Sequence, residues 1–138
     1  MRVEYVQAVL DVAALIPAGQ VLSYGDIAVL LEHGGPRQVG SVMSHHGSGA
    51  PWWRVIRASG EPLAHHEFLA LEKYLAEETA LRGETAGDHP SWRVDMARAR
   101  WNPSEDDFGR IYAIAAVLHA AVALSGAQMS VPRDGMQT

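Results

Sequence analysis

The side chains best suited to molecular recognition in this chain fall between Tyr24 and Ile56. This stretch contains Tyr24, the run Arg37-Gln38-Val39-Gly40 and the run Pro51-Trp52-Trp53-Arg54-Val55-Ile56. An indole ring offers a flat apolar surface for stacking, and a planar guanidinium both stacks on aromatic rings and donates hydrogen bonds. The chain contains no cysteine, so thiol nucleophiles, disulfides and thiolate metal sites are excluded. The residue types therefore indicate binding rather than thiol catalysis.

Short helices are predicted to position these residues. Apolar spacing predicts a first helix over residues 4–15, a second over residues 25–31 with Ser23 as its N-cap, and a third over residues 37–45. The run Gly34-Gly35-Pro36 would form the turn between the second and third helices. Two short helices joined by a glycine-containing turn are typical of a helix-turn-helix, whose second helix commonly meets DNA.

The middle of the chain predicts a mixture of strands and one more helix. A short strand is expected over residues 53–56, with Trp53 facing the interior. A helix is expected over residues 67–80, a loop over residues 82–91 and a second strand over residues 92–96, with Trp92 in the core. The helix would present one apolar face, formed by Phe68, Leu71 and Leu75.

The expected fold is mainly α with short strands: a winged-helix-like DNA-binding domain with a helix-turn-helix, plus an extra C-terminal helix. We expect the domain over residues 1–101 and a helical extension over residues 102–138. The extension would begin with a helix capped by Ser104 and Asp107 that runs to about Leu124, followed by a disordered tail after Gly126. The apolar face of this helix either packs on the domain or pairs with a partner.

Three motifs, in this order along the chain, resemble those of the alkylguanine-DNA alkyltransferases. Residues 16–28 are similar to the family's proline-glycine turn and tyrosine-containing helix start, and residues 36–40 to the start of its recognition helix. Residues 51–56 resemble its active-site segment, Pro-Cys-His-Arg-Val, and the resemblance as a whole covers residues 16–81. Trp52 stands at the cysteine position and Trp53 at the histidine position. The chain is therefore similar to the alkyltransferase-like proteins, a non-enzymatic branch that binds a lesion and flags it for repair.

The resemblance implies which residues would contact DNA. Tyr24 would press on the phosphate on the 3′ side of the target nucleotide, and Arg37 would enter the base stack through the minor groove. A guanidinium suits that place because it can stack on bases and donate to the orphaned partner base. Small residues would let the third helix lie close in the groove. The implied DNA-binding residues are Tyr24, Arg37, Gln38, Val39, Gly40 and Ser41.

The resemblance also implies a pocket for the extruded base. Trp52 would form a wall, and Arg54 would pack beneath the pocket or make a cation–π contact with the base. Tyr24, Pro51 and His46 would complete the lining. The chain departs from the family in two places: His46 replaces the asparagine of the recognition helix, and residues 61–66 replace a glycine-rich loop.

The implied partner is double-stranded DNA containing O-alkylated guanine, with nucleotide excision repair proteins acting next. The net charge of −5 opposes DNA binding, but residues 33–60 contain three arginines and no acidic residue. We expect no enzyme activity, no cofactor and no metal, because adjacent histidines on a helix, such as His45 and His46, point about 100° apart. We also expect a monomer in the cytoplasm with no membrane span, because residues 111–124 are too short an apolar run and His119 interrupts them.

Two other functions fit the sequence. A winged-helix transcription regulator would bind undamaged DNA through the major groove, although the predicted recognition helix has few long polar side chains. A protein-interaction module would use the helix that follows Ser104 and would have little affinity for any DNA.

Overall fold

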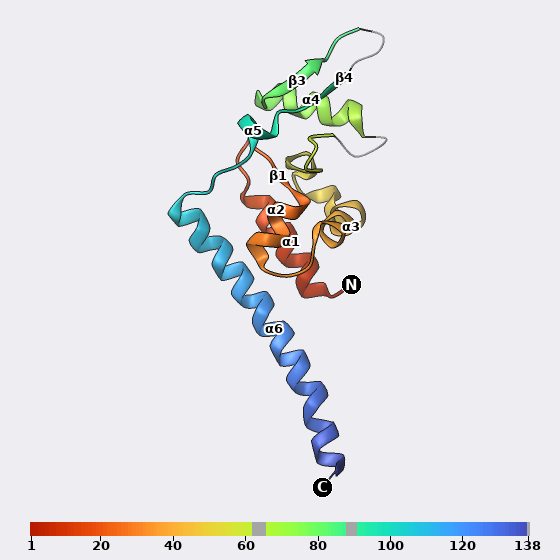
Figure 1. Cartoon of the computed structure of the whole chain (residues 1–138), viewed down its shortest axis with the longest axis vertical. Helices are drawn as coiled ribbons and strands as arrows, with labels where there is room; N and C mark the ends of the chain where they lie inside the picture. The colour runs from red at the N-terminus through yellow and green to blue at the C-terminus, as the bar shows by residue number, and fades with distance from the viewer. Residues whose placement is uncertain (62–65, 88–90, 138) are drawn as a thin grey trace.

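The computed structural model describes residues 1–61, 66–87 and 91–137, with side chains described as far as Gly126. Four helices form most of the main core: α1 (Val3–Leu15), α2 (Tyr24–Leu31), α3 (Pro36–His46) and α6 (Glu105–Gln137). Helix α4 (Glu67–Glu77), the hairpin of β3 (Leu81–Glu84) and β4 (Ser91–Val94), and α5 (Met96–Ala99) gather at the other end of the molecule (Figure 1). This arrangement confirms a mainly helical fold with short strands.

Helices α2 and α3 form the predicted helix-turn-helix. Ser23 caps α2 through a reciprocal pair of hydrogen bonds: Ser23 Oγ accepts the Asp26 N–H at 3.0 Å and Asp26 Oδ2 accepts the Ser23 N–H at 2.9 Å. The turn needs glycine at position 34, where φ is +72° and a Cβ atom would lie 2.4 Å from Tyr5 Oη. Pro36 then opens α3, where its missing N–H removes no helical hydrogen bond.

The predicted strand over residues 53–56 is wrong in its first half. Residues Trp52–Arg54 form a 3₁₀ turn, and only Val55–Ile56 form a strand, β2. Strand β2 pairs in parallel with β1 (Leu22–Ser23), in the register Leu22↔Val55 and Ser23↔Ile56. Because β1 has two residues, the chain before Val55 has no strand partner and closes a local turn instead, with the Arg54 N–H donating to the Pro51 carbonyl.

The predicted helix over residues 67–80 ends earlier and packs through another face. Helix α4 stops at Glu77 because Glu78 adopts a left-handed conformation with φ of 57°. Its buried residues are Ala70 and Tyr74, whereas Phe68 is 92% exposed and Leu75 is 57% exposed. The predicted apolar face is therefore wrong.

The loop predicted over residues 82–91 is wrong at both of its ends, because Leu81–Glu84 (β3) and Ser91–Val94 (β4) pair as antiparallel strands; residues 88–90 lie outside the described residues. Their register places Arg82 opposite Arg93 and Gly83 opposite Trp92. Gly83 has φ of +92°, and a Cβ atom there would lie 2.0 Å from the Ser91 carbonyl oxygen. Trp92 packs edge-on against Tyr74 at 5.9 Å between ring centroids, in a second core cluster formed by the hairpin, α4 and α5.

Helix α6 packs on the domain through one face. Ser104 and Asp107 cap it as predicted, and Ile111, Ala115 and Leu118 are buried in the same cluster as α1 and α2. His119 Nε2 also lies 2.8 Å from the Leu31 carbonyl oxygen at the end of α2. The helical backbone continues to Gln137, and disorder of the tail after Gly126 stays a prediction.

The same helix bears on the expectation that nothing crosses a membrane. Residues Glu105–Gly126 are long and apolar enough to do so by length and composition, because they contain an 18-residue window with a mean hydropathy of 1.6. The prediction considered only the apolar run over residues 111–124, whereas the helix already begins at Glu105, six residues before Ile111. One such helix is a weak indication, because core helices of water-soluble proteins meet the same criteria, and a face of α6 does belong to the core.

Candidate functional site

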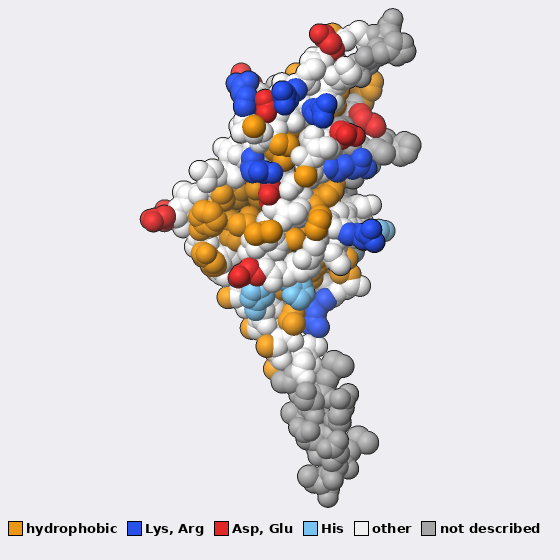
Figure 2. Space-filling view, viewed as in Figure 1, with side chains coloured by type: hydrophobic (Ala, Val, Ile, Leu, Met, Phe, Trp, Pro, Cys, Tyr) orange, Lys and Arg blue, Asp and Glu red, His pale blue; other side chains and the backbone are white. Residues whose placement is uncertain are grey.

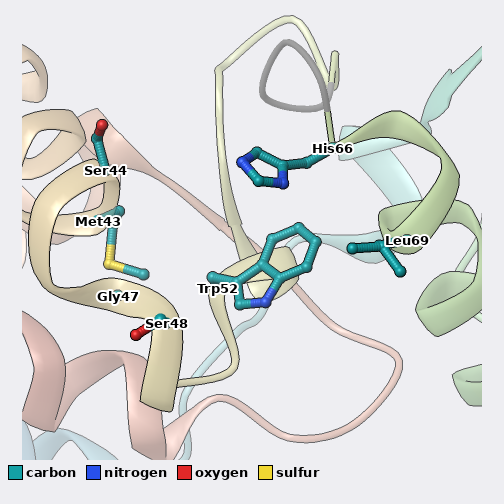
Figure 3. A pocket seen from close by; sticks show the side chains of 7 residues that line it. All are labelled: Met43, Ser44, Gly47, Ser48, Trp52, His66 and Leu69. Carbon is teal, nitrogen blue, oxygen red and sulfur yellow. The ribbon is translucent and has the colours of Figure 1, made fainter.

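A cavity of about 320 Å³ lies between the end of α3 and the start of α4. Its walls combine Met43 and Ser44 of α3, Gly47 and Ser48 of the following 3₁₀ turn (Gly47–Gly49), and Trp52. His66 and Leu69 at the start of α4 complete the lining (Figure 3). Among the described residues that line it there is no Asp, Glu, Lys or Arg, so this part of the cavity suits a neutral ligand that is partly apolar.

Trp52 is the predicted pocket residue that lines this cavity. Its side chain points into the space between α3 and α4, with the His66 ring beside it (Figure 3). The Trp52 and His66 ring centroids are 5.6 Å apart with the planes tilted by 53°, and Trp53 meets Trp52 edge-on at 5.7 Å. The indole therefore has aromatic support on two sides and presents its remaining surface to the cavity.

Arg54 does not line the cavity. Of the two predicted places for it, beneath the pocket or in contact with the base, its hydrogen bonds favour the first. Its Nη1 donates to the Ile16 carbonyl at 2.9 Å, its Nε donates to Glu77 Oε2 at 3.2 Å, and its Nη2 donates to Glu77 Oε1. Its guanidinium carbon lies 5.3 Å from the centre of the Trp53 ring. Arg54 therefore anchors the 3₁₀ turn to α1 and α4, which fixes the backbone that carries Trp52.

The contact with Arg54 changes the pKa of the Glu77 carboxylate. Burial acts to raise the pKa of Glu77, but the hydrogen bonds from Arg54 and from the Gly19 N–H, the latter at 3.1 Å, outweigh it. The pKa of Glu77 therefore lies below its ordinary value, and the carboxylate stays charged beside Arg54.

Trp53 packs away from the cavity, against the second core cluster. Tyr74 Oη donates to the Trp53 carbonyl at 2.5 Å, and Lys73 Nζ lies 4.9 Å from the ring centre. The expectation that Trp53 faces inward is met, although a 3₁₀ turn rather than strand alternation separates the two tryptophans.

The predicted DNA-binding residues on α3 divide into exposed and structural ones. Arg37 is exposed in the first turn and has no ion pair with any residue that the structure describes. Gln38 is exposed, but its Oε1 accepts the Gly35 N–H at 3.0 Å and so caps the helix. Val39 is fully buried, so its side chain holds α3 on the core, and a contact between Val39 and DNA, which would have to use its backbone, stays a prediction. Gly40 and Ser41 are partly exposed.

The Tyr24 ring packs against Gly40 of α3. A Cβ atom on Gly40 would lie 3.5 Å from the Tyr24 ring, so the two residues are in close contact. The Tyr24 hydroxyl is buried and has no hydrogen-bond partner within the described part of the chain. Burial raises the pKa of Tyr24, and the positive charge of Arg57 opposes this. Contact between this hydroxyl and a phosphate would therefore require the side chain to change rotamer.

The remaining predicted pocket residues lie outside the cavity lining. His46 is exposed at the end of α3, its ring centroid 6.4 Å from that of His45, and Pro51 is half-buried before Trp52. Among the described residues no group of three metal-ligating side chains is found, and His65 lies outside them. Sequence reasoning missed Met43, Ser44, Gly47, Ser48, His66 and Leu69 because they meet only through the packing of α3 against α4.

Comparison with known proteins identifies the family. Residues 4–81 match the family model of the 6-O-methylguanine DNA methyltransferase DNA-binding domain. The chain is 37% identical over 106 residues to proteins named DNA base-flipping protein from Escherichia coli (strain K12) and Shigella flexneri, covering 70% of this chain and 73% of each relative.

The fold matches two crystal structures from S. pombe. One is Atl1 in complex with damaged DNA containing O6-carboxymethylguanine, and the other is ATL in complex with DNA. Each is 26% identical with a TM-score of 0.61, and each match covers 75% of this chain and 100% of the other. Together with the family model and the sequence relatives, they show that this chain is an alkyltransferase-like protein of the 6-O-methylguanine DNA methyltransferase family.

Proposed function

We propose that this chain is a non-enzymatic sensor that binds O-alkylated guanine in duplex DNA and holds the flipped base in the cavity beside Trp52. One observation carries the proposal: the indole of Trp52 lines a cavity of about 320 Å³ in a chain that has no cysteine. The resemblance of residues 51–56 to the enzymes' active-site segment implies that Trp52 stands at their cysteine position. The E. coli relative named for base flipping and the S. pombe neighbour bound to damaged DNA support it.

The energetics favour a damaged base. Extrusion of a nucleotide from a duplex costs a few kcal/mol, and less for a base that already pairs poorly. Stacking on an aromatic side chain contributes about 1–3 kcal/mol per base, which is comparable with that cost. The uncharged lining of Met43, Trp52 and Leu69 accepts an alkyl group without leaving a charge unpaired.

The helix-turn-helix supplies the remaining parts of the proposed mechanism. Arg37 is exposed and unpaired among the described residues at the start of α3, so its guanidinium is available to fill the space that the flipped base leaves. Gly40 and Ser41 on the next turn permit close approach to the minor groove. The exposed face of α3 has few long polar side chains, which disfavours the rival function of reading sequence in the major groove.

Repair would then be completed by other proteins. Because the chain has no thiol to accept the alkyl group, binding alone leaves the lesion in place. We propose that the bound complex directs nucleotide excision repair to the site.

The test is fluorescence anisotropy with two duplexes that differ by a single guanine methylated on its exocyclic oxygen, at the same salt concentration. We expect tighter binding to the lesion, and we expect Trp52→Ala to weaken lesion binding by about tenfold or more, the equivalent of one stacked base. Tyr112→Ala, which removes an exposed ring on α6, is the matched control and should change nothing. Equal binding of both duplexes by the parent protein would refute the proposal.

A further inference from the structure

Three arginines at the hairpin end of the molecule have no role in the site described so far. Arg82 and Arg93 lie on β3 and β4, and Arg57 lies in the turn after β2. All three are exposed, and none forms an ion pair with a residue that the structure describes. Arg57, Arg82 and Arg93 are called the arginine surface below.

The backbone holds the arginine surface together. Arg82 and Arg93 are directly opposite each other in the hairpin register. The Val94 N–H donates to the Gly60 carbonyl at 2.9 Å, and the Gly60 N–H donates to the Arg57 carbonyl at 2.9 Å, so the turn that carries Arg57 is bonded to β4 beside Arg93. Like charges placed directly opposite in a hairpin destabilise it, and a polyanion would relieve that repulsion.

The arginine surface is a local cluster of positive charge on an acidic chain. The net charge is −5, and other arginines are neutralised, with Arg54 paired to Glu77 and Arg100 paired to Asp26 at 3.1 Å. Glu84 shares the outer face of the hairpin, opposite Ser91, and forms no ion pair with Arg82 or Arg93. On the face shown in Figure 2, Lys and Arg side chains lie over the hairpin end with Asp and Glu side chains between them.

Helix α4 connects the hairpin to the cavity beside Trp52. Trp92 on its inner face packs against Tyr74 of α4, and the first turn of α4 supplies His66 and Leu69 to the cavity. The hairpin starts at Leu81, the last residue that matches the family model, and it lies within the 70% of this chain that aligns with the E. coli relative.

We propose that the arginine surface binds phosphates of the duplex to one side of the lesion, as a second contact separate from α3 and the cavity. This proposal rests on the proposed function, because it takes duplex DNA as the ligand. Arginine contacts to phosphates add affinity and set orientation without reading the base, so they would strengthen binding to damaged and undamaged DNA alike.

The test is the salt dependence of binding for Arg82→Ala/Arg93→Ala. Each lost phosphate contact lowers the slope of log affinity against log salt by about 0.9, which equals about eightfold in affinity at 0.1 M salt. We expect a slope smaller by about 1.8 and an unchanged ratio between lesion and undamaged duplexes. Arg82→Lys/Arg93→Lys should keep most of the slope, because an ammonium ion also binds phosphate as a point charge.

Arg2→Ala/Arg110→Ala is the charge-matched control, since it removes two exposed arginines from other elements. Thermal unfolding of Arg82→Ala/Arg93→Ala should show no loss of stability, because the substitution removes a repulsion. If its slope falls no more than that of the control, while the parent still prefers the lesion, the arginine surface does not bind DNA and the proposed function stands. If the parent binds neither duplex, both proposals fail.

Discussion

Trp52 and Arg54 show how neighbouring residues acquire opposite roles. The 3₁₀ turn points Trp52 into the cavity and sends Arg54 to Glu77 and the Ile16 carbonyl. The resemblance implied that Trp52 would form a wall of the pocket and left open whether Arg54 packs beneath the pocket or contacts the base. The partner that removes Arg54 from the cavity, Glu77, is distant in sequence and lies at the end of α4, so nothing in the local sequence could reveal the pair.

At this scale we predict that Glu77→Gln lowers the free energy of unfolding by about 2 kcal/mol at pH 7, because it leaves the Arg54 guanidinium without its counter-charge. The folded-state pKa of Glu77 lies below its ordinary value of 4.5. The stability from this contact is therefore fully present above pH 4.5 and is lost as the pH falls through the depressed folded value.

Urea unfolding of the parent and of Glu77→Gln at pH 7 and at pH 3 checks this prediction. The difference between the two proteins should shrink at the lower pH. Glu72→Gln, an exposed carboxylate on the same helix, is the control and should stay within about 0.5 kcal/mol of the parent. A constant difference at both pH values would contradict the assigned pKa shift.

At the scale of elements, local signals located the helix-turn-helix well. Ser23, the glycines at 34 and 35, and Pro36 are signals that act within a few residues, and α2 and α3 begin and end close to where they were predicted. Strand β3 was missed because Gly83 is typical of a loop, and only the pairing with β4 makes Leu81–Glu84 a strand, whereas β4 was predicted close to its place, over residues 92–96. The buried face of α4 was missed for a similar reason, since Tyr74 is chosen by its contacts with Trp92 and Trp53 rather than by spacing.

The turn between α2 and α3 gives a prediction for Gly34→Ala. The position has φ of +72°, and the new methyl group would collide with the Tyr5 ring, whose hydroxyl bonds to the His33 carbonyl at 3.3 Å. We expect a loss of about 2 kcal/mol in the free energy of unfolding.

Gly49→Ala is the matched control for the turn. A Cβ atom at Gly49 meets nothing within 4 Å and its φ is not positive, so we expect a change within about 0.5 kcal/mol. Thermal or urea unfolding of both variants tests the claim. Equal effects of the two substitutions would show that Gly34 has no special part in the turn.

At the scale of the whole molecule, the first and last helices share one core. Leu118 and Ile111 of α6 pack in the same cluster as Val9 and Val12 of α1, and His119 reaches the end of α2. The C-terminal helix is therefore part of the platform that holds α2 and α3 in place. The sequence left open whether this helix packs or pairs, because its apolar residues extend around more than one face: Tyr112, Val117 and Leu124 are exposed.

Two leucines on α6 allow the shared core to be tested within one helix. Leu118 is 1% exposed and Leu124 is 61% exposed. We expect Leu118→Ala to lower the free energy of unfolding by about 3 kcal/mol, because it leaves a cavity between α6 and the N-terminal helices, and Leu124→Ala to change it by less than about 0.5 kcal/mol. Urea unfolding at neutral pH measures both. Because α2 and α3 rest on this core, Leu118→Ala should also weaken DNA binding as temperature rises, whereas Leu124→Ala should not. If the two variants were equally stable, α6 would not be packed on the domain in solution, and α1, α2 and α3 would have to hold the DNA-binding surface without it.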